Sequence, residues 1–154
     1  MIEQLLRDSR IAMIYEGTNG IQALDLVGRK LPKNQGQAMM SLISDIRKDI
    51  KGHDHYSAVM TEKALKELES CNVWLLMNGM KDPEEAAAVA TPYLHVFSLT
   101  LLSWMWFKLV RSDNLVYNKL CQFFFEYQLP ELDLHVKRLK KGKGMYFCID
   151  DNLL

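Results

Sequence analysis

Apolar residues recur every three to four positions along most of this chain, and this helical spacing is the feature that most constrains its fold. No stretch alternates apolar and polar residues for long, as a half-buried strand would. The pair Asn19-Gly20, a common hairpin turn, is followed by a helical pattern and so indicates a loop-to-helix junction. The sequence therefore predicts an all-α fold.

Four long helices are predicted in the larger part of the chain, at about residues 39–50, 56–77, 83–111 and 113–141. Asp82 followed by Pro83 is a strong helix start, since aspartate caps a helix and proline suits its first position. Pro92 and Pro130 are expected to kink or break their helices. Short connections favour antiparallel neighbours, so the simplest architecture is an up-down antiparallel helical bundle. The second helix is expected to bury Val59, Ala64, Leu65, Leu68, Cys71 and Leu75.

The chain divides at Pro32, where the second of two shorter helices ends. Residues 1–31 are predicted to hold a helix over about 2–10, a non-helical turn at 15–17 and a second helix capped by Thr18 or Asn19. These residues have the character of the last helices of another unit. Residues 34–141 form the bundle domain, and residues 142–154 form a tail without periodicity.

Charge and cysteine content bound the environment of the chain. Nineteen basic and nineteen acidic residues leave no net charge, so no nucleic-acid partner is expected. The basic cluster at 137–143 has two interpretations, an interaction tail or a solvated last helical turn, and cations at a helix C-terminus favour the second. The three cysteines are far apart and form no CxxC pair, which favours reduced thiols and a cytoplasmic location.

One segment raises the question of a membrane. Residues 93–110 are almost wholly apolar but contain His95, Ser98, Ser103 and Lys108. A membrane span and a buried central helix are both open interpretations, and the polar residues favour the buried helix. No membrane span is expected.

The stretch with the most chemistry is residues 7–22, RDSRIAMIYEGTNGIQ. It places the carboxylate of Glu16 on a turn, followed at once by Gly17 and a helix cap. Gly17 has no side chain and allows a ligand to come close, while the following helix N-terminus offers backbone N–H groups. From these residues alone, Glu16 is open to two interpretations, a reactive carboxylate or an ordinary surface one.

This run resembles the acyl-CoA dehydrogenase signature, in which Arg-Asp and a later Ile-Tyr-Glu-Gly-Thr precede Ile-Gln. The extension ALDLVGRKL at 23–31 is similar to the larger bacterial subgroup that has an additional C-terminal helical domain, of the 3-methylmercaptopropionyl-CoA dehydrogenase-like kind. Residues 93–106 and 123–130 agree with that subgroup more loosely. The resemblance covers almost the whole chain.

The resemblance implies roles for single residues. Glu16 matches the catalytic glutamate that removes the α-proton of an acyl-CoA thioester, after which the β-hydride passes to the flavin and leaves a trans-2-enoyl-CoA. Tyr15 and Gly17 match substrate-binding positions along the acyl and thioester site. Thr18 matches a cofactor-binding position beside the flavin. Gly20 departs from relatives that have a longer, flavin-contacting side chain there.

The resemblance also implies what the chain lacks. In the family FAD is held by a helical N-terminal domain and a β-domain, and no β-rich segment occurs here. The chain is therefore expected to be an excised fragment or the product of a shortened gene, to bind no FAD by itself and to be inactive alone. In a full-length enzyme its partners would be the acyl-CoA substrate, an electron-transfer acceptor and a second subunit of a homo-oligomer, a dimer.

A second hypothesis treats residues 34–141 as a non-catalytic dimerisation or docking module. The aromatic and methionine side chains at 104–107 and 123–125 could form an interface patch or the bundle core, and core is favoured. His53 and His55 could be a metal pair, but no third ligand is adjacent, and a polar interhelical turn is the favoured interpretation. No metal site is predicted.

Overall fold

The computed structural model describes residues 2–14, 18–111 and 114–146, and all regular structure within them is helical. The predicted all-α class is therefore confirmed. The helices are α1 (Ile2–Ile14), α2 (Asn19–Asp25), α3 (Gln37–Ile50), α4 (Tyr56–Trp74), α5 (Pro83–Val110), α6 (Leu115–Phe123) and α7 (Glu131–Lys140). Single π-helical turns at Leu26–Lys30, Leu75–Gly79 and Phe124–Gln128 extend α2, α4 and α6, and 3-10 turns lie at Lys33–Gly36 and Gly142–Met145.

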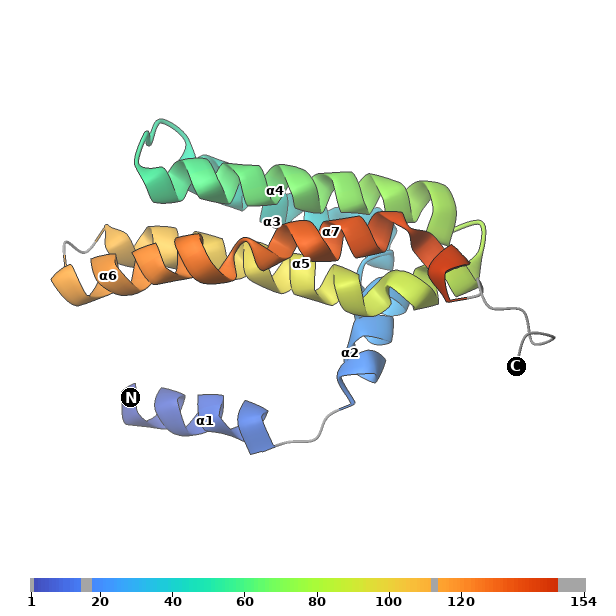
Figure 1. The fold of residues 1–154 in the computed structure, drawn as a ribbon, viewed down its shortest axis with the longest axis horizontal. Helices are drawn as coiled ribbons and strands as arrows, with labels where there is room; N and C mark the ends of the chain where they lie inside the picture. The colour runs from blue at the N-terminus through green and yellow to red at the C-terminus, as the bar shows by residue number, and fades with distance from the viewer. Residues whose placement is uncertain (1, 15–17, 112–113, 147–154) are drawn as a thin grey trace.

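The long helices pack side by side as an up-down bundle (Figure 1). α5 contacts α4 on one side and α6 and α7 on another, while α3 packs against α4. α6 and α7 follow one another along the same axis and together form the fourth long helix, broken at Pro130 as predicted. α2 crosses one end of the bundle, and α1 lies apart from it.

The buried interior forms two clusters. The larger joins α4, α5, α6 and α7 through Leu68, Tyr93, Cys121 and Leu139. Tyr93 is fully buried, and its hydroxyl donates a 2.6 Å hydrogen bond to Asn72 Oδ1, which satisfies the polar end of an otherwise apolar side chain. The smaller cluster joins α3, α4 and α5 and contains the buried residues Ile46, Ile50, Ala58, Leu65 and Phe107.

α5 is the central helix, as predicted for the apolar segment 93–110. Asp82 caps it by accepting a 2.9 Å hydrogen bond from the Glu84 backbone N–H, and the helix continues through Pro92. By length and composition α5 could cross a membrane, and 39% of its most apolar window is buried. Its buried hydroxyls, Thr100 and Ser103, donate to carbonyls of α5 itself and so remain satisfied inside the bundle.

Two local predictions were wrong. Val59 was expected to face inward but is 45% exposed, because Ala58 and Thr61 take the inward-facing positions on that turn of α4. The first helix was expected to end near Arg10 but reaches Ile14, since residues 11–14 have no helix-breaking residue among them.

Candidate functional site

Three of the four predicted site residues, Tyr15, Glu16 and Gly17, lie outside the described residues, and their roles stay predictions. The fourth, Thr18, is exposed at the N-cap position of α2. Its backbone carbonyl accepts a 3.1 Å hydrogen bond from the Gln22 N–H, but its hydroxyl makes no capping bond. Thr18 is thus the N-cap residue of α2, as predicted. The side chain of Thr18 does not make the capping hydrogen bond that was expected.

The predicted catalytic turn lies in the sequence between two described helices. α1 ends at Ile14 and α2 begins at Asn19. No atom lies within 4 Å of the place where a Cβ on Gly20 would stand. The space beside Gly20 is therefore open among the described residues.

α2 packs against the bundle. Ala23 is fully buried, and Leu26, Val27 and Leu31 pack against the larger core cluster. α2 and the π turn after it both contact α5. The first residues after the predicted catalytic turn are therefore held against the central helix.

An ion pair within the same helix adds local rigidity. Arg29 Nη2 donates a 2.9 Å hydrogen bond to Asp25 Oδ2, and Arg29 Nε also bonds this carboxylate. These bonds, with a smaller effect from Lys30, lower the pKa of Asp25 to about 2. Pairs at this spacing on an exposed helix surface stabilise a helix only weakly, so the apolar packing is the stronger anchor.

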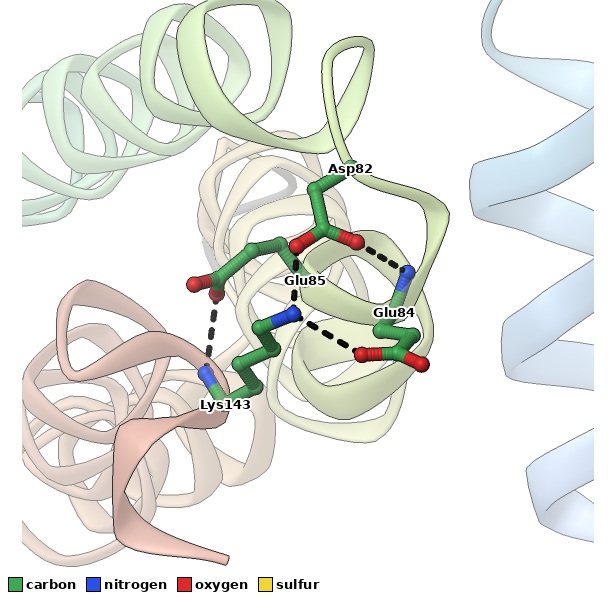
Figure 2. A network of polar contacts seen from close by, with 4 residues as sticks. All are labelled: Asp82, Glu84, Glu85 and Lys143. Atoms are coloured by element: carbon green, nitrogen blue, oxygen red, sulfur yellow. Dashed lines mark hydrogen bonds and ion pairs between the residues drawn. The ribbon is translucent and has the colours of Figure 1, made fainter. Parts of the chain in front are cut away.

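A polar clasp closes the end of the bundle where α5 begins (Figure 2). Lys143, in the 3-10 turn after α7, places its Nζ 2.8 Å from Glu84 Oε2 and also bonds Asp82. Its backbone N–H donates a 2.8 Å hydrogen bond to Glu85 Oε2. The Lys143 bond is the main cause that lowers the pKa of Asp82, and the carboxylates in turn raise the pKa of Lys143.

Gly142 makes the clasp sterically feasible. Its φ is +61°, a conformation that favours glycine, and a Cβ there would overlap Glu85 Oε2. From the sequence, Lys143 was expected to lie in the solvated last turn of a helix. α7 ends at Lys140, so Lys137 and Lys140 do belong to its last turn, whereas Lys143 instead ties that end of the chain to α5.

The two histidines considered as a metal pair have structural roles. His55 Nδ1 accepts a 3.2 Å hydrogen bond from the Ser57 backbone N–H and caps α4, and His53 packs edge-on against Phe107. They line a 280 Å³ surface pocket together with Arg111. Among residues 2–14, 18–111 and 114–146, no three His, Cys, Asp or Glu residues gather closely enough to hold a metal ion.

A histidine pair that the sequence did not predict joins α5 to α7. The rings of His95 and His135 stack with centroids 4.2 Å apart and planes 9° from parallel. His135 is buried, and its Nδ1 is without a hydrogen-bond partner. Burial, and secondarily the charge of His95, lower the pKa of His135. The two residues are 40 positions apart in the sequence, which carries no local sign of their contact.

The described cysteines are buried free thiols. Burial raises the pKa of both Cys71 and Cys121 to about 11, so neither is a thiolate near neutral pH. Both side chains are therefore thiols buried in the core. Cys148 lies outside the described part of the chain.

Comparison with known proteins identifies the class. The family model for acetyl-CoA dehydrogenase C-terminal-like domains matches residues 42–149, more than two thirds of the chain. This chain belongs to that family of acyl-CoA dehydrogenase C-terminal helical domains. The match begins within α3 and includes the whole of α4 to α7.

Two curated proteins are similar to this chain in sequence. The chain is 32% identical over 93 residues to the broad-specificity linear acyl-CoA dehydrogenase FadE5 of Mycobacterium tuberculosis, which covers 60% of this chain and 14% of that protein. It is 28% identical over 110 residues to 3-methylmercaptopropionyl-CoA dehydrogenase of Ruegeria pomeroyi, covering 67% of this chain and 18% of that protein. The match thus spans less than a fifth of each relative, and the resemblance to acyl-CoA dehydrogenases is confirmed.

Proposed function

We propose that this chain is the C-terminal part of a FAD-dependent acyl-CoA dehydrogenase and that Glu16 is the base of the reaction. The supporting observation is a juxtaposition. The signature-like run at 7–22 ends within α2, which packs against the central helix of a domain whose family membership is shown. The end of this run is therefore joined to a helix that contacts the bundle.

In this proposal the chain contributes the proton transfer. Glu16 removes a proton from the α-carbon of the acyl-CoA thioester, and Tyr15 and Gly17 line the acyl and thioester site. Positioned general bases of this kind contribute about 10²–10⁴-fold to a rate. The hydride from the β-carbon would go to FAD, which other parts of the enzyme would hold and which an electron-transfer acceptor would reoxidise. Thr18 is exposed at the start of α2, and in this proposal it lies beside the flavin.

The flavin itself is proposed to be held mainly by parts of the enzyme outside this chain. Two surface pockets of the described residues, of 420 and 280 Å³, are lined by side chains of α3 to α6 and the α3–α4 turn, and neither includes Thr18. We therefore expect the isolated chain to bind no FAD and to be inactive. A cytoplasmic location is part of this proposal, and the two described free thiols are compatible with it.

The test is the substitution Glu16→Gln in the enzyme that contains both this chain and its flavin-bearing part. Turnover of an acyl-CoA is expected to fall at least about 100-fold, while the flavin content of the purified enzyme stays unchanged. Turnover within a factor of two of the parent would refute the assignment of the base. A yellow sample of the isolated chain would refute the placement of the flavin site.

A second function, dimerisation or docking without chemistry, is supported by a different observation. Several apolar side chains of α6 are exposed although Phe124 and Phe125 beside them are buried. Dimerisation or docking through that surface would not require the carboxylate of Glu16.

A further inference from the structure

A stacked pair of histidines joins α5 to α7 near the middle of both helices. The ring planes of His95 and His135 lie 9° from parallel, and His95 is exposed whereas His135 is only 8% exposed. The Nδ1 atom of His135 has no hydrogen-bond partner among the described residues. Adding a proton to a neutral imidazole makes both of its nitrogens donors, so the charged form of His135 would bury a donor without an acceptor. The closed contact therefore favours the neutral ring.

The geometry of the pair suits a proton better than a metal ion. Imidazole nitrogens bind a metal at about 2 Å through lone pairs that lie in the ring plane. Two nearly parallel rings direct these lone pairs along parallel planes and cannot aim them at one ion. Neutral rings can stack, whereas two charged rings with centroids 4.2 Å apart repel one another. The pair is therefore a candidate site of proton uptake.

The surroundings of the pair reinforce this preference. The charged and titratable groups that act on His135 are His95 of α5 and Arg138 and Glu131 of its own helix. Burial is the main cause that lowers the pKa of His135. The charges of His95 and Arg138 lower this pKa further, and that of Glu131 opposes them. The packed position of α7 thus disfavours a proton on His135.

α7 is a helix of 10 residues with a break at its start. Pro130, which has no backbone N–H, separates α7 from the π turn, and no side chain caps this end of the helix. α4 also packs against α7, and there Glu67 lies 3.6 Å from Lys140. After α7, Lys143 bonds the carboxylates at the start of α5. A short element of this kind can open at a lower free energy than the whole domain.

We propose that the His95–His135 pair is an acid-sensitive latch, and that proton uptake in mildly acidic solution releases α7 from α5 while the rest of the bundle stays folded. In the open state His135 lies in water and has its ordinary pKa of 6.5, whereas burial lowers its pKa in the closed state. Opening therefore takes up a proton. By linkage, the stabilisation by the latch is complete above about pH 6.5 and is lost as the pH falls toward the pKa of the closed state.

The bond between Lys143 and Asp82 does not titrate in this range. It lowers the pKa of Asp82 below the ordinary value of 3.8, so Asp82 stays charged in mildly acidic solution. One proton taken up by His135 sets the size of the response. Between about pH 7.5 and about pH 5.5 the opening constant of α7 can rise by at most about 10-fold. The inference goes beyond the proposed function, because it involves no residue of the predicted catalytic turn.

Hydrogen exchange of the full chain, followed by mass spectrometry at about pH 7.5 and about pH 5.5, tests the proposal. The measured rates are divided by the intrinsic exchange rates at each pH. Amides of residues 131–140 should exchange at a lower free energy of opening than the buried parts of α4 and α5. Their opening constant should rise about 3- to 10-fold at the lower pH. Exchange of α7 only together with α4 and α5, or an opening constant that does not change with pH, would overturn the proposal.

Three variants separate the latch from other causes of opening. His135→Gln should remove the acid response. His95→Glu, at an exposed position, places a carboxylate beside the His135 ring and so favours its protonated form in the closed state. The acid response of His95→Glu should therefore fall below about 2-fold. Lys143→Met breaks the clasp and should raise the opening constant by the same factor at both pH values.

His53→Gln is the matched control, because His53 lies in the α3–α4 turn against Phe107, and it should keep the response of the parent. His95→Glu gives the same decision where His135→Gln does not fold, since its position is exposed. An acid response that survives in His135→Gln, stays complete in His95→Glu or disappears in Lys143→Met would each contradict the latch.

Discussion

The clasp between Lys143 and the start of α5 depends on glycine at position 142, and Gly142→Ala is expected to open it. An alanine must take a φ of +61°, which costs about 1–2 kcal/mol for a residue with a Cβ. The new Cβ would also lie 3.2 Å from Glu85 Cδ and overlap its Oε2. Glu85 can turn away, but it then releases the backbone N–H of Lys143.

The magnitude follows from these two costs. A hydrogen bond to a charged acceptor contributes about 1.5–3 kcal/mol, and the partly exposed site places this one at the low end of that range. Gly142→Ala should therefore lower the free energy of unfolding by about 2.5–3.5 kcal/mol. For a chain of this length that corresponds to a fall in Tm of about 5–14 °C.

Urea unfolding followed by far-UV circular dichroism measures this change. Gly144→Ala is the matched control, because no atom lies within 4 Å of its Cβ position, and it should change stability by no more than about 0.5 kcal/mol. In a Glu85→Ala background, Gly142→Ala should cost only its backbone strain, about 1–2 kcal/mol. Equal effects of the two glycine substitutions, or an unchanged cost without Glu85, would refute this account of the clasp.

Three further outcomes are expected from the same unfolding assay, at concentrations where the chain is monomeric. Phe124→Ala should lower the free energy of unfolding by about 3–5 kcal/mol, because the Phe124 ring is buried. Phe123→Ala, on the exposed face, should lower it by less than about 1 kcal/mol. Similar values for the two variants would contradict the assigned orientation of α6. Tyr93→Phe should cost about 1 kcal/mol by removing the bond to Asn72, and no change would show that this bond contributes nothing. Burial lowers the pKa of His135, so the unfolded chain binds this proton at higher pH than the folded one, and stability should fall as pH drops below the ordinary value of 6.5. His135→Leu should lose less stability than the parent between neutral and mildly acidic pH, and parallel curves would contradict this.

The sequence predicts helices well where their signals are local. Asp82 and Pro83 begin α5 because the cap and the first-turn proline act on the backbone beside them. Pro130 separates the π turn from α7 for the same kind of reason, the missing N–H and the fixed φ of proline. Periodicity also predicts that the apolar segment 93–110 is the central helix.

Contacts between distant residues carry no such signal. His135 stacks on His95, and Lys143 bonds Asp82, only because the bundle brings α7 back along α5. Val59 was placed on the wrong face because apolar residues occur on both sides of α4. Periodicity alone does not distinguish a face that is buried in the bundle from one that is left exposed.

The predicted site depends on resemblance more than on pattern. A lone glutamate on a turn is compatible with many roles, and Glu16 becomes a candidate base only because the residues around it match a family signature in order. Its neighbour Thr18 is exposed at the helix start, which is compatible with a partner beyond this chain. In the proposed function, the chemistry of the site also requires parts of an enzyme outside this chain.

The central claim, that Glu16 moves the α-proton, is tested most directly by hydrogen exchange. An acyl-CoA is incubated in D₂O with the enzyme that contains both this chain and its flavin-bearing part. Oxygen and the electron acceptor are left out, and NMR follows the α-hydrogens of the acyl-CoA. Glu16→Gln should slow the exchange at least about 100-fold, while Glu3→Gln, a change to an exposed carboxylate of α1, should leave it unchanged. Exchange in the Glu16→Gln enzyme at the rate of the parent would contradict the account.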